Sequence, residues 1–165
     1  MFKHMTADLY IEDVASIDVD MLIEKGIKGV IFDIDNTLEP YHTKKPGKST
    51  KDIFEAYEAK GLKVAILSNA KMERAAEFCL DFTDNWVAHA GKPLKKGYIK
   101  LAEKMGLKPS ELASVGDQLF TDILGGNLFG CFTICVKPIE KTEPGFVAFK
   151  RFFEKPFIKG KFDAK

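Results

Sequence analysis

The sequence lacks the features that mark membrane-spanning, nucleic-acid-binding and secreted proteins. Its 165 residues contain no apolar stretch near the roughly 20 residues that a membrane-spanning helix needs. The formal net charge is only +1, which gives no general attraction for nucleic acid, and no specific nucleic-acid partner is expected. The first residues, MFKHMTADLYIEDV, carry acids where a secretory signal needs an apolar run. These absences favour a cytoplasmic protein.

Cysteine is scarce as well, with only Cys79, Cys131 and Cys135 in the chain. None of them has the CxxC spacing of a common metal site. Cys131 and Cys135 fall in one predicted strand and could pair only if that strand broke. We therefore expect three reduced thiols in the core, as is usual in the cytosol. No repeat or low-complexity segment divides the chain, and its length fits a single domain over 1–165.

What the sequence does contain is a regular alternation of two patterns. Short apolar runs, typical of fully buried strands, lie at 29–34, 62–68, 86–90, 112–117 and 131–136. Apolar residues at helical spacing occur between them, from Thr50, from Met72, around Tyr98 and over 121–129. In the last of these segments, Gly125 and Gly126 would allow two backbones to approach closely. The alternation predicts an α/β fold with a three-layer, Rossmann-like parallel sheet, its core at about 28–136.

Polar side chains follow four of the predicted strands, at the point where each strand ends. They are Asp33, Asp35 and Thr37 after the first strand, Ser68 and Asn69 after the second, Lys92 after the third, and Asp117 and Asp122 after the fourth. Ligands of open α/β sheets bind beyond the carboxyl ends of the strands. We therefore expect these residues to form one site.

The residue types in this set favour phosphoryl transfer. Carboxylates this close together raise one another's pKa unless a cation offsets their charge, and Mg²⁺ suits such oxygen ligands. The hydroxyls of Thr37 and Ser68, the amide of Asn69 and the charge of Lys92 could hold a phosphoryl group. One acid can attack phosphorus and form an aspartyl-phosphate, while a second acid two residues away transfers protons. The sequence thus predicts a Mg²⁺-dependent phosphatase that acts on a phosphomonoester.

Four short motifs in this set resemble the four motifs of the haloacid dehalogenase-like superfamily. They are DIDNT at 33–37, LSN at 67–69, KP at 92–93 and GDQLFTD at 116–122. Their order and spacing match that superfamily over roughly residues 28–136. The chain resembles in particular its small, YqeG-like subclass III phosphatases, which are similar to the mitochondrial phosphatidylglycerophosphate phosphatases.

The resemblance implies a role for each matching residue. Asp33 matches the nucleophile, and Asp35 matches the general acid and base. The metal ligands would be the side chain of Asp33, the backbone carbonyl of Asp35 and the side chain of Asp117. The residues that match the phosphate-binding loop and lysine are Thr37, Ser68 and Lys92. Asp122 matches a second acid that often acts through water or orients its neighbours.

Other interpretations stay open at this stage. Asn69 and Asp117 could instead cap the helices that follow them, and Asp122 could be an acid at the start of a helix. Lys95 and Lys96 lie close enough to Lys92 to compete for its role. For the whole chain, the alternatives to an enzyme are a receiver-like signalling domain and a non-catalytic binding protein of the same fold.

The intervals between the motifs leave no room for a separate cap domain. Only a loop, a helix and a strand fit between Thr37 and Ser68, and only a helix and a short strand between Asn69 and Lys92. An open site would admit a bulky phosphorylated substrate, such as a lipid, a protein or a nucleotide, and small phosphate esters stay open as well. Alternatively, a second subunit of a homo-oligomer covers the site.

The last segment, residues 146–165, combines basic and aromatic residues. It has six basic and two acidic residues, and a helical projection places four phenylalanines on one face, namely Phe146, Phe149, Phe152 and Phe153. Such a helix is typical of peripheral contact with an anionic membrane, for which phosphatidylglycerophosphate would be a fitting substrate. The alternative is a terminal helix that packs on the sheet and leaves its basic residues in water. Aromatic and basic tails can also bind RNA or a partner subunit.

Overall fold

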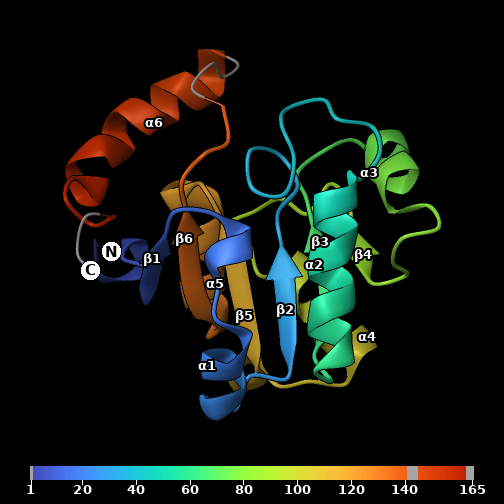
Figure 1. Ribbon diagram of the computed structural model, residues 1–165. Coiled ribbons are helices and arrows are strands. Elements are labelled where there is room, and N and C mark those ends of the chain that lie inside the picture. Colours follow the sequence, from blue (N-terminus) through green and yellow to red (C-terminus); the bar gives the residue numbers. More distant parts are fainter. Residues whose placement is uncertain (1, 141–144, 163–165) are drawn as a thin grey trace.

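A computed structural model describes residues 2–140 and 145–162 of the chain. Its centre is one parallel sheet in the strand order β1-β6-β5-β2-β3-β4 (Figure 1). The strands are β1 (Leu9–Ile11), β2 (Gly29–Phe32), β3 (Lys63–Leu67), β4 (Trp86–Val87), β5 (Leu112–Gly116) and β6 (Phe132–Val136). Along the chain, β3 and β4 are added on one side of β2, whereas β5 and β6 are added on the other side. This change of side places β2 and β5 next to each other in the middle of the sheet.

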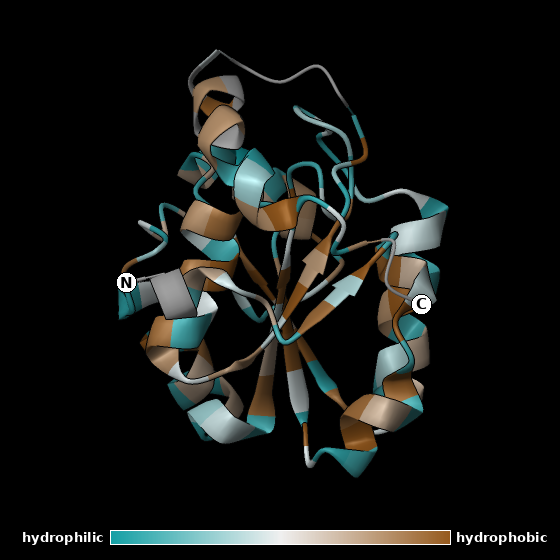
Figure 2. Cartoon of the chain, turned by 90° about the vertical axis from the view of Figure 1, so that its left-hand side faces the viewer, coloured by the Kyte–Doolittle hydropathy of each residue, from teal (hydrophilic) through white to brown (hydrophobic). Residues whose placement is uncertain are grey.

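Helices connect successive strands and cover both faces of the sheet (Figure 2). The α-helices are α1 (Val19–Glu24), α2 (Lys48–Ala59), α3 (Met72–Cys79), α4 (Lys96–Met105), α5 (Leu124–Phe129) and α6 (Gly145–Ile158). Shorter helical turns are η1 (Phe2–Met5), η2 (Val14–Ser16), η3 (Pro109–Glu111) and the π-helical η4 (Leu119–Ile123). Among the described residues, no helix combines the length and the apolar character needed to cross a membrane.

The alternation of side chains along β2 divides the core into two halves. Phe32 points to one face, where its ring lies 5.4 Å from that of Phe54 in α2. Its neighbour Ile31 belongs to the cluster on the other face, with Tyr98 and Leu101 of α4. Both clusters are buried because helices cover each face, which confirms the predicted three-layer α/β sheet. The three cysteines are free and buried, as expected.

The structure differs from the sequence-based expectation in its details. It adds β1 at the edge of the sheet, paired in parallel with β6, and this strand precedes the first predicted one. The third predicted strand, expected over 86–90, is only Trp86–Val87. The helix expected over 121–129 is divided into η4 and α5. In α5, a side chain at Gly125 would meet the backbone Cα of Pro93 at 3.2 Å, so the close approach of two backbones predicted there is present.

The last helix, α6, lies over the carboxyl end of the sheet on the side of β6 (Figure 1). Glu154 of α6 is fully buried, and its Oε1 accepts a hydrogen bond of 3.0 Å from the backbone N–H of Phe120 in η4. Phe157, Ile158 and Phe162 pack against a small cluster that includes Leu119. The helix is therefore attached to the same edge of the sheet at which the predicted site residues lie.

Candidate active site

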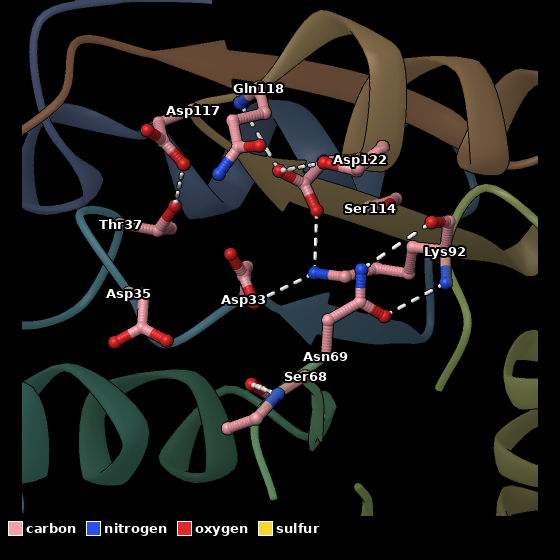
Figure 3. A network of polar contacts seen from close by, with 12 residues as sticks. Asp33, Asp35, Thr37, Ser68, Asn69, Lys92, Ser114, Asp117, Gln118 and Asp122 are labelled. Atoms are coloured by element: carbon pink, nitrogen blue, oxygen red, sulfur yellow. Dashed lines mark hydrogen bonds and ion pairs between the residues drawn. The ribbon is translucent and has the colours of Figure 1, made fainter. Parts of the chain in front are cut away.

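The side chains expected to share one site lie together at the carboxyl edge of the sheet (Figure 3). They surround a pocket of about 180 Å³ lined by Asp33, Asp35, Tyr41, Ser68, Asn69, Ala70, Lys92, Gln118, Thr121 and Val147. The loops after β2, β3, β4 and β5 bring them there, because parallel strands end at a common edge. Of the other predicted residues, Thr37, Asp117 and Asp122 are buried beside this pocket.

Lys92 lies between two carboxylates at the centre of the site. Its Nζ is 2.7 Å from Oδ1 of Asp33 and 2.6 Å from Oδ1 of Asp122, and its side chain is only 3% exposed. Burial alone would lower the pKa of this lysine, but the two carboxylates outweigh burial and raise the pKa. Lys92 is therefore a fixed positive charge at the edge of the pocket.

The loop after β3 holds Lys92 in place. The side chain of Asn69 accepts a hydrogen bond of 2.9 Å from the backbone N–H of Lys92 and donates one of 3.4 Å to its carbonyl oxygen. Asn69 lines the pocket, and its amide group binds the backbone of Lys92. It does not cap α3, because Lys71 occupies the N-cap position of that helix. The neighbouring hydroxyl of Ser68 accepts a 3.1 Å hydrogen bond from the N–H of Ala70, which fixes its position at the pocket wall.

Asp33 is an acid in surroundings that oppose its charge. Burial is the main cause that raises the pKa of this acid, and the nearby carboxylates of Asp122 and Asp35 raise it further. Lys92 lowers the pKa. The net effect raises the pKa of Asp33 to about 7. A cation beside Asp33 would favour its ionised form.

Three buried carboxylates form a cluster that could hold such a cation. Asp33, Asp117 and Asp122 each offer an oxygen, and these oxygens lie within 4.8 Å of one another. The hydroxyl of Thr37 donates to Oδ1 of Asp117 at 3.3 Å, which orients that carboxylate. Three acids against the single charge of Lys92 leave the cluster negative, and hard divalent cations prefer oxygen ligands of this kind. The residues therefore fit a divalent cation.

Asp122 is held in η4 by contacts on both of its oxygens. Oδ1 lies on Lys92, while Oδ2 accepts a 3.1 Å hydrogen bond from the N–H of Gln118. This fold-back brings Asp122 so close to β5 that a side chain at Gly116 would meet its Cγ at 2.3 Å. Gly116 is thus required at the end of β5 for Asp122 to reach Lys92.

Asp35 lies apart from the acidic cluster. Its carboxylate points away from Asp33 in Figure 3 and makes a two-pronged ion pair with Arg74 of α3, at 2.6 and 2.9 Å. Arg74 also donates to the carbonyl oxygen of Thr43 at 3.2 Å. Asp35 nevertheless lines the same pocket as Asp33, so both members of the acid pair border one space.

Arg74 and Asn36 also shape this site, although the sequence did not predict a role for them. Arg74 belongs to an amphipathic helix and is 39 positions from Asp35, so no local pattern marked it. Asn36 lies within the DIDNT motif, adopts the left-handed conformation with φ of 61°, and is fully buried. Its side chain accepts a 2.9 Å hydrogen bond from the N–H of Glu140 and fixes the loop after β2. The tolerance of asparagine for left-handed backbone was the available signal for this second residue.

Comparison with known proteins places the chain in a family. A model of the haloacid dehalogenase-like hydrolases matches residues 39–130. The chain is 31% identical over 156 residues to a probable phosphatase, YqeG, of Bacillus subtilis (strain 168), covering 94% of this chain and 91% of that protein. It is 29% identical over 146 residues to phosphatidylglycerophosphate phosphatase 1, chloroplastic/mitochondrial, of Arabidopsis thaliana, covering 83% of this chain. The match spans only 42% of the Arabidopsis protein.

Solved structures of similar fold include two with most of their length matched. One is an uncharacterized protein from Listeria monocytogenes serotype 4b, with a TM-score of 0.57 and 22% identity over 71% of this chain and 85% of that one. Another is the cobalt-bound deoxy-D-mannose-octulosonate 8-phosphate phosphatase of Haemophilus influenzae, with a TM-score of 0.56 and 14% identity over 83% of this chain and 90% of that one. At these identities the likeness concerns the fold alone.

Proposed function

Because this chain belongs to the haloacid dehalogenase-like hydrolase family and is a phosphatase, we propose that it hydrolyses a phosphomonoester through an aspartyl-phosphate on Asp33. The observation that carries the proposal is the placement of the Asp33 carboxylate. It lines the pocket, lies 2.7 Å from the charge of Lys92 and shares an acidic cluster with Asp117. A nucleophile, a fixed cation and a metal-binding acid are thus within reach of one phosphoryl group.

We propose Mg²⁺ as the cation of this site. The carboxylates of Asp33 and Asp117 and the backbone carbonyl of Asp35 would hold it. When bound, the ion supplies positive charge that offsets the anionic oxygens of the substrate. Both oxygens of Asp122 already have partners in Lys92 and Gln118, so we assign Asp122 to the positioning of Lys92.

The first half of the proposed reaction transfers the phosphoryl group to the protein. A carboxylate oxygen of Asp33 attacks phosphorus, and the bond between phosphorus and the ester oxygen breaks. The electron pair stays on the ester oxygen, which receives a proton from Asp35. To donate that proton, the Asp35 carboxylate has to leave its ion pair with Arg74 and first take up a proton from solvent. Lys92 and the Ser68 hydroxyl hold the non-bridging oxygens meanwhile.

The second half releases inorganic phosphate. A water molecule attacks the phosphorus of the aspartyl-phosphate, and Asp35 accepts the proton that the water loses. The bond between phosphorus and the Asp33 oxygen breaks, which restores the carboxylate. Asp35 ends the cycle protonated, as it began. A receiver-like domain would stop before this half, so repeated turnover separates the two functions.

We further propose a lipid phosphomonoester of the phosphatidylglycerophosphate type as the substrate. Two relatives carry the name phosphatidylglycerophosphate phosphatase. No cap domain is inserted in the described stretch from Thr37 to Lys92, which favours access for a bulky molecule. Such a substrate implies a cytoplasmic protein that works at a membrane surface, with 146–165 as the segment in contact.

The nucleophile can be tested with a generic aryl phosphate and purified protein. We expect Asp33→Asn to lower turnover at least about 1,000-fold, because the amide cannot form the acyl phosphate. Chelation should abolish the activity of the wild type, and added Mg²⁺ should restore it. Turnover is measured as phosphate released per protein molecule over many cycles.

The matched control is Asp52→Asn, which makes the same change on an exposed part of α2 and should leave turnover unchanged. Retention of wild-type turnover by Asp33→Asn would show that another residue is the nucleophile. A single burst of one aryl alcohol per protein, with no release of inorganic phosphate, would favour the receiver-like alternative instead.

A further inference from the structure

A second, larger cavity lies beside the candidate active site, between the end of β6 and α6. Its volume is about 520 Å³, and it is lined by Asp117, Val136, Lys137, Pro138, Lys155, Ile158, Lys159 and Phe162. Asp117 lies between the two spaces, because it is a wall of this cavity and also a member of the acidic cluster with Asp33. A molecule in this cavity would therefore lie next to the proposed reaction centre.

Apart from Asp117 and the three lysines, the residues that line the cavity are apolar and fixed by packing. Val136 is the last residue of β6, and Ile158 is the last residue of α6. Phe162 makes an edge-to-face contact with Tyr10, with ring centroids 5.5 Å apart, and Ile158 packs against the cluster around Leu119. No step of the proposed phosphatase reaction needs an apolar space of this size. Its volume falls within the range of roughly 300–1,000 Å³ typical of small-molecule sites.

Three lysines border this apolar space. Lys155 is exposed on α6, and Lys159 is exposed directly after the end of this helix, so both lie at the edge of the cavity. Lys137 is paired with Glu12 at 2.5 Å, and its Nζ lies 5.4 Å above the ring of Phe162. An apolar interior with a basic edge is complementary to an amphiphile that carries a negative charge at one end.

We propose that this cavity binds the acyl chain of an amphiphilic phosphomonoester whose phosphate is held at Asp33 and Lys92. The proposal rests on the proposed phosphatase function and adds the part of the protein that recognises the lipid. It assigns the cavity to the acyl chain of the substrate, since, among the described residues, only Asp117 lies between the cavity and the acidic cluster where the phosphate reacts. Lys155 and Lys159 would then contact the remaining anionic groups of the lipid.

The proposal can be tested with straight-chain alkyl phosphates of two to ten carbons, used below their micelle concentrations. Each methylene that enters the cavity should raise kcat/KM by up to about fourfold. We expect Ile158→Glu and Ile158→Trp to remove this dependence on chain length, the first by placing a charge in the cavity and the second by filling it. Both variants should hydrolyse a short aryl phosphate at the wild-type rate, because Ile158 is outside the catalytic machinery.

The controls are Ile99→Glu and Ile99→Trp on α4, at a partly exposed isoleucine that lines neither space. They should keep the full dependence on chain length. A flat chain-length series for the wild type, with aryl phosphate still hydrolysed, would overturn the proposal even if the Ile158 variants failed to fold. An unchanged slope in the folded Ile158 variants would overturn it as well. If the wild type does not hydrolyse aryl phosphate at all, the proposed function is refuted instead.

Discussion

The Asp33 carboxyl group is buried where its charged form is costly to maintain. Its pKa is raised to about 7, chiefly by burial, although Lys92 lies only 2.7 Å away. The same placement makes the group available for attack on phosphorus once a cation offsets its surroundings. Catalytic function and stability therefore make opposite demands on this residue.

The stability of the metal-free protein should depend on the pH through Asp33. The pKa of Asp33 is 3.8 in the unfolded chain and about 7 in the folded one. As the pH rises between these values, the unfolded chain releases a proton that the folded protein retains, so the folded state loses relative stability. We expect Asp33→Asn to escape this loss. The free energy of unfolding of Asp33→Asn minus that of the wild type should therefore be larger at pH 8 than at pH 5, by roughly 3 kcal/mol.

Urea unfolding of both proteins with a chelator at the two pH values measures this difference. Titration of the groups that do not interact with Asp33 cancels because both proteins contain them. If the difference in the free energy of unfolding between Asp33→Asn and the wild type is the same at pH 5 and pH 8, a raised pKa for Asp33 is contradicted. The Asp52→Asn variant serves again as control, and its difference from the wild type should not change in this way.

The residues of the site could be listed from the sequence, but their contacts could not. Strand ends identify Asp33, Ser68 and Asp117 because the fold brings such positions to one edge. The pairing of Asp35 with Arg74 depends on how α3 packs against the loop after β2, which no spacing in the sequence encodes. The same holds for Asn69, whose amide binds the backbone of Lys92.

Among the elements, β5 and η4 depend on each other through a glycine. Gly116 ends β5, and a methyl group there would lie within 2.3 Å of Asp122 Cγ. Asp122 cannot shift without losing its contact with Lys92, since the ion pair is only 2.6 Å long and fully buried. The end of the strand and the π-helical turn after it therefore fix the central lysine together.

We expect Gly116→Ala to lower phosphatase turnover at least about 100-fold, because Asp122 and Lys92 are displaced from Asp33. The free energy of unfolding should fall by about 1–3 kcal/mol, the usual cost of an overpacked interior. The control is Gly145→Ala at the start of α6, where a side chain would meet nothing within 4 Å. Turnover of Gly116→Ala within threefold of the wild type would show that Asp122 does not need its observed position.

Long, strongly patterned elements were predictable from the sequence, and short or irregular ones were not. The runs that became β2, β3, β5 and β6 are apolar on both faces, so burial alone identifies them. β1 has three half-buried residues and exists only through its pairing with β6, far along the chain. The division of 121–129 into η4 and α5 follows from the contacts of Asp122, which local helical spacing does not reveal.

At the scale of the whole molecule, α6 combines the two arrangements between which the sequence could not decide. One side of the helix packs on the domain through Glu154 and Phe157. The other side leaves Phe149, Phe152 and Phe153 exposed, by 63%, 67% and 49%. Phe146, expected on the same face, lies outside the described side chains. Three exposed phenylalanines next to basic residues are typical of a surface that contacts a membrane.

If α6 brings the active site to an anionic membrane, the protein should float with anionic lipid vesicles at low salt. Binding should weaken as salt is raised from about 50 to 500 mM, because screening removes the attraction of the lysines. Replacing Phe149 and Phe152 by serine should weaken it at least about tenfold, since each ring loses its burial in the lipid. Leu80→Ser, at an equally exposed apolar residue elsewhere, should bind as the wild type does. Failure of the wild type to float, or equal binding to vesicles without anionic lipid, would leave α6 with a packing role alone.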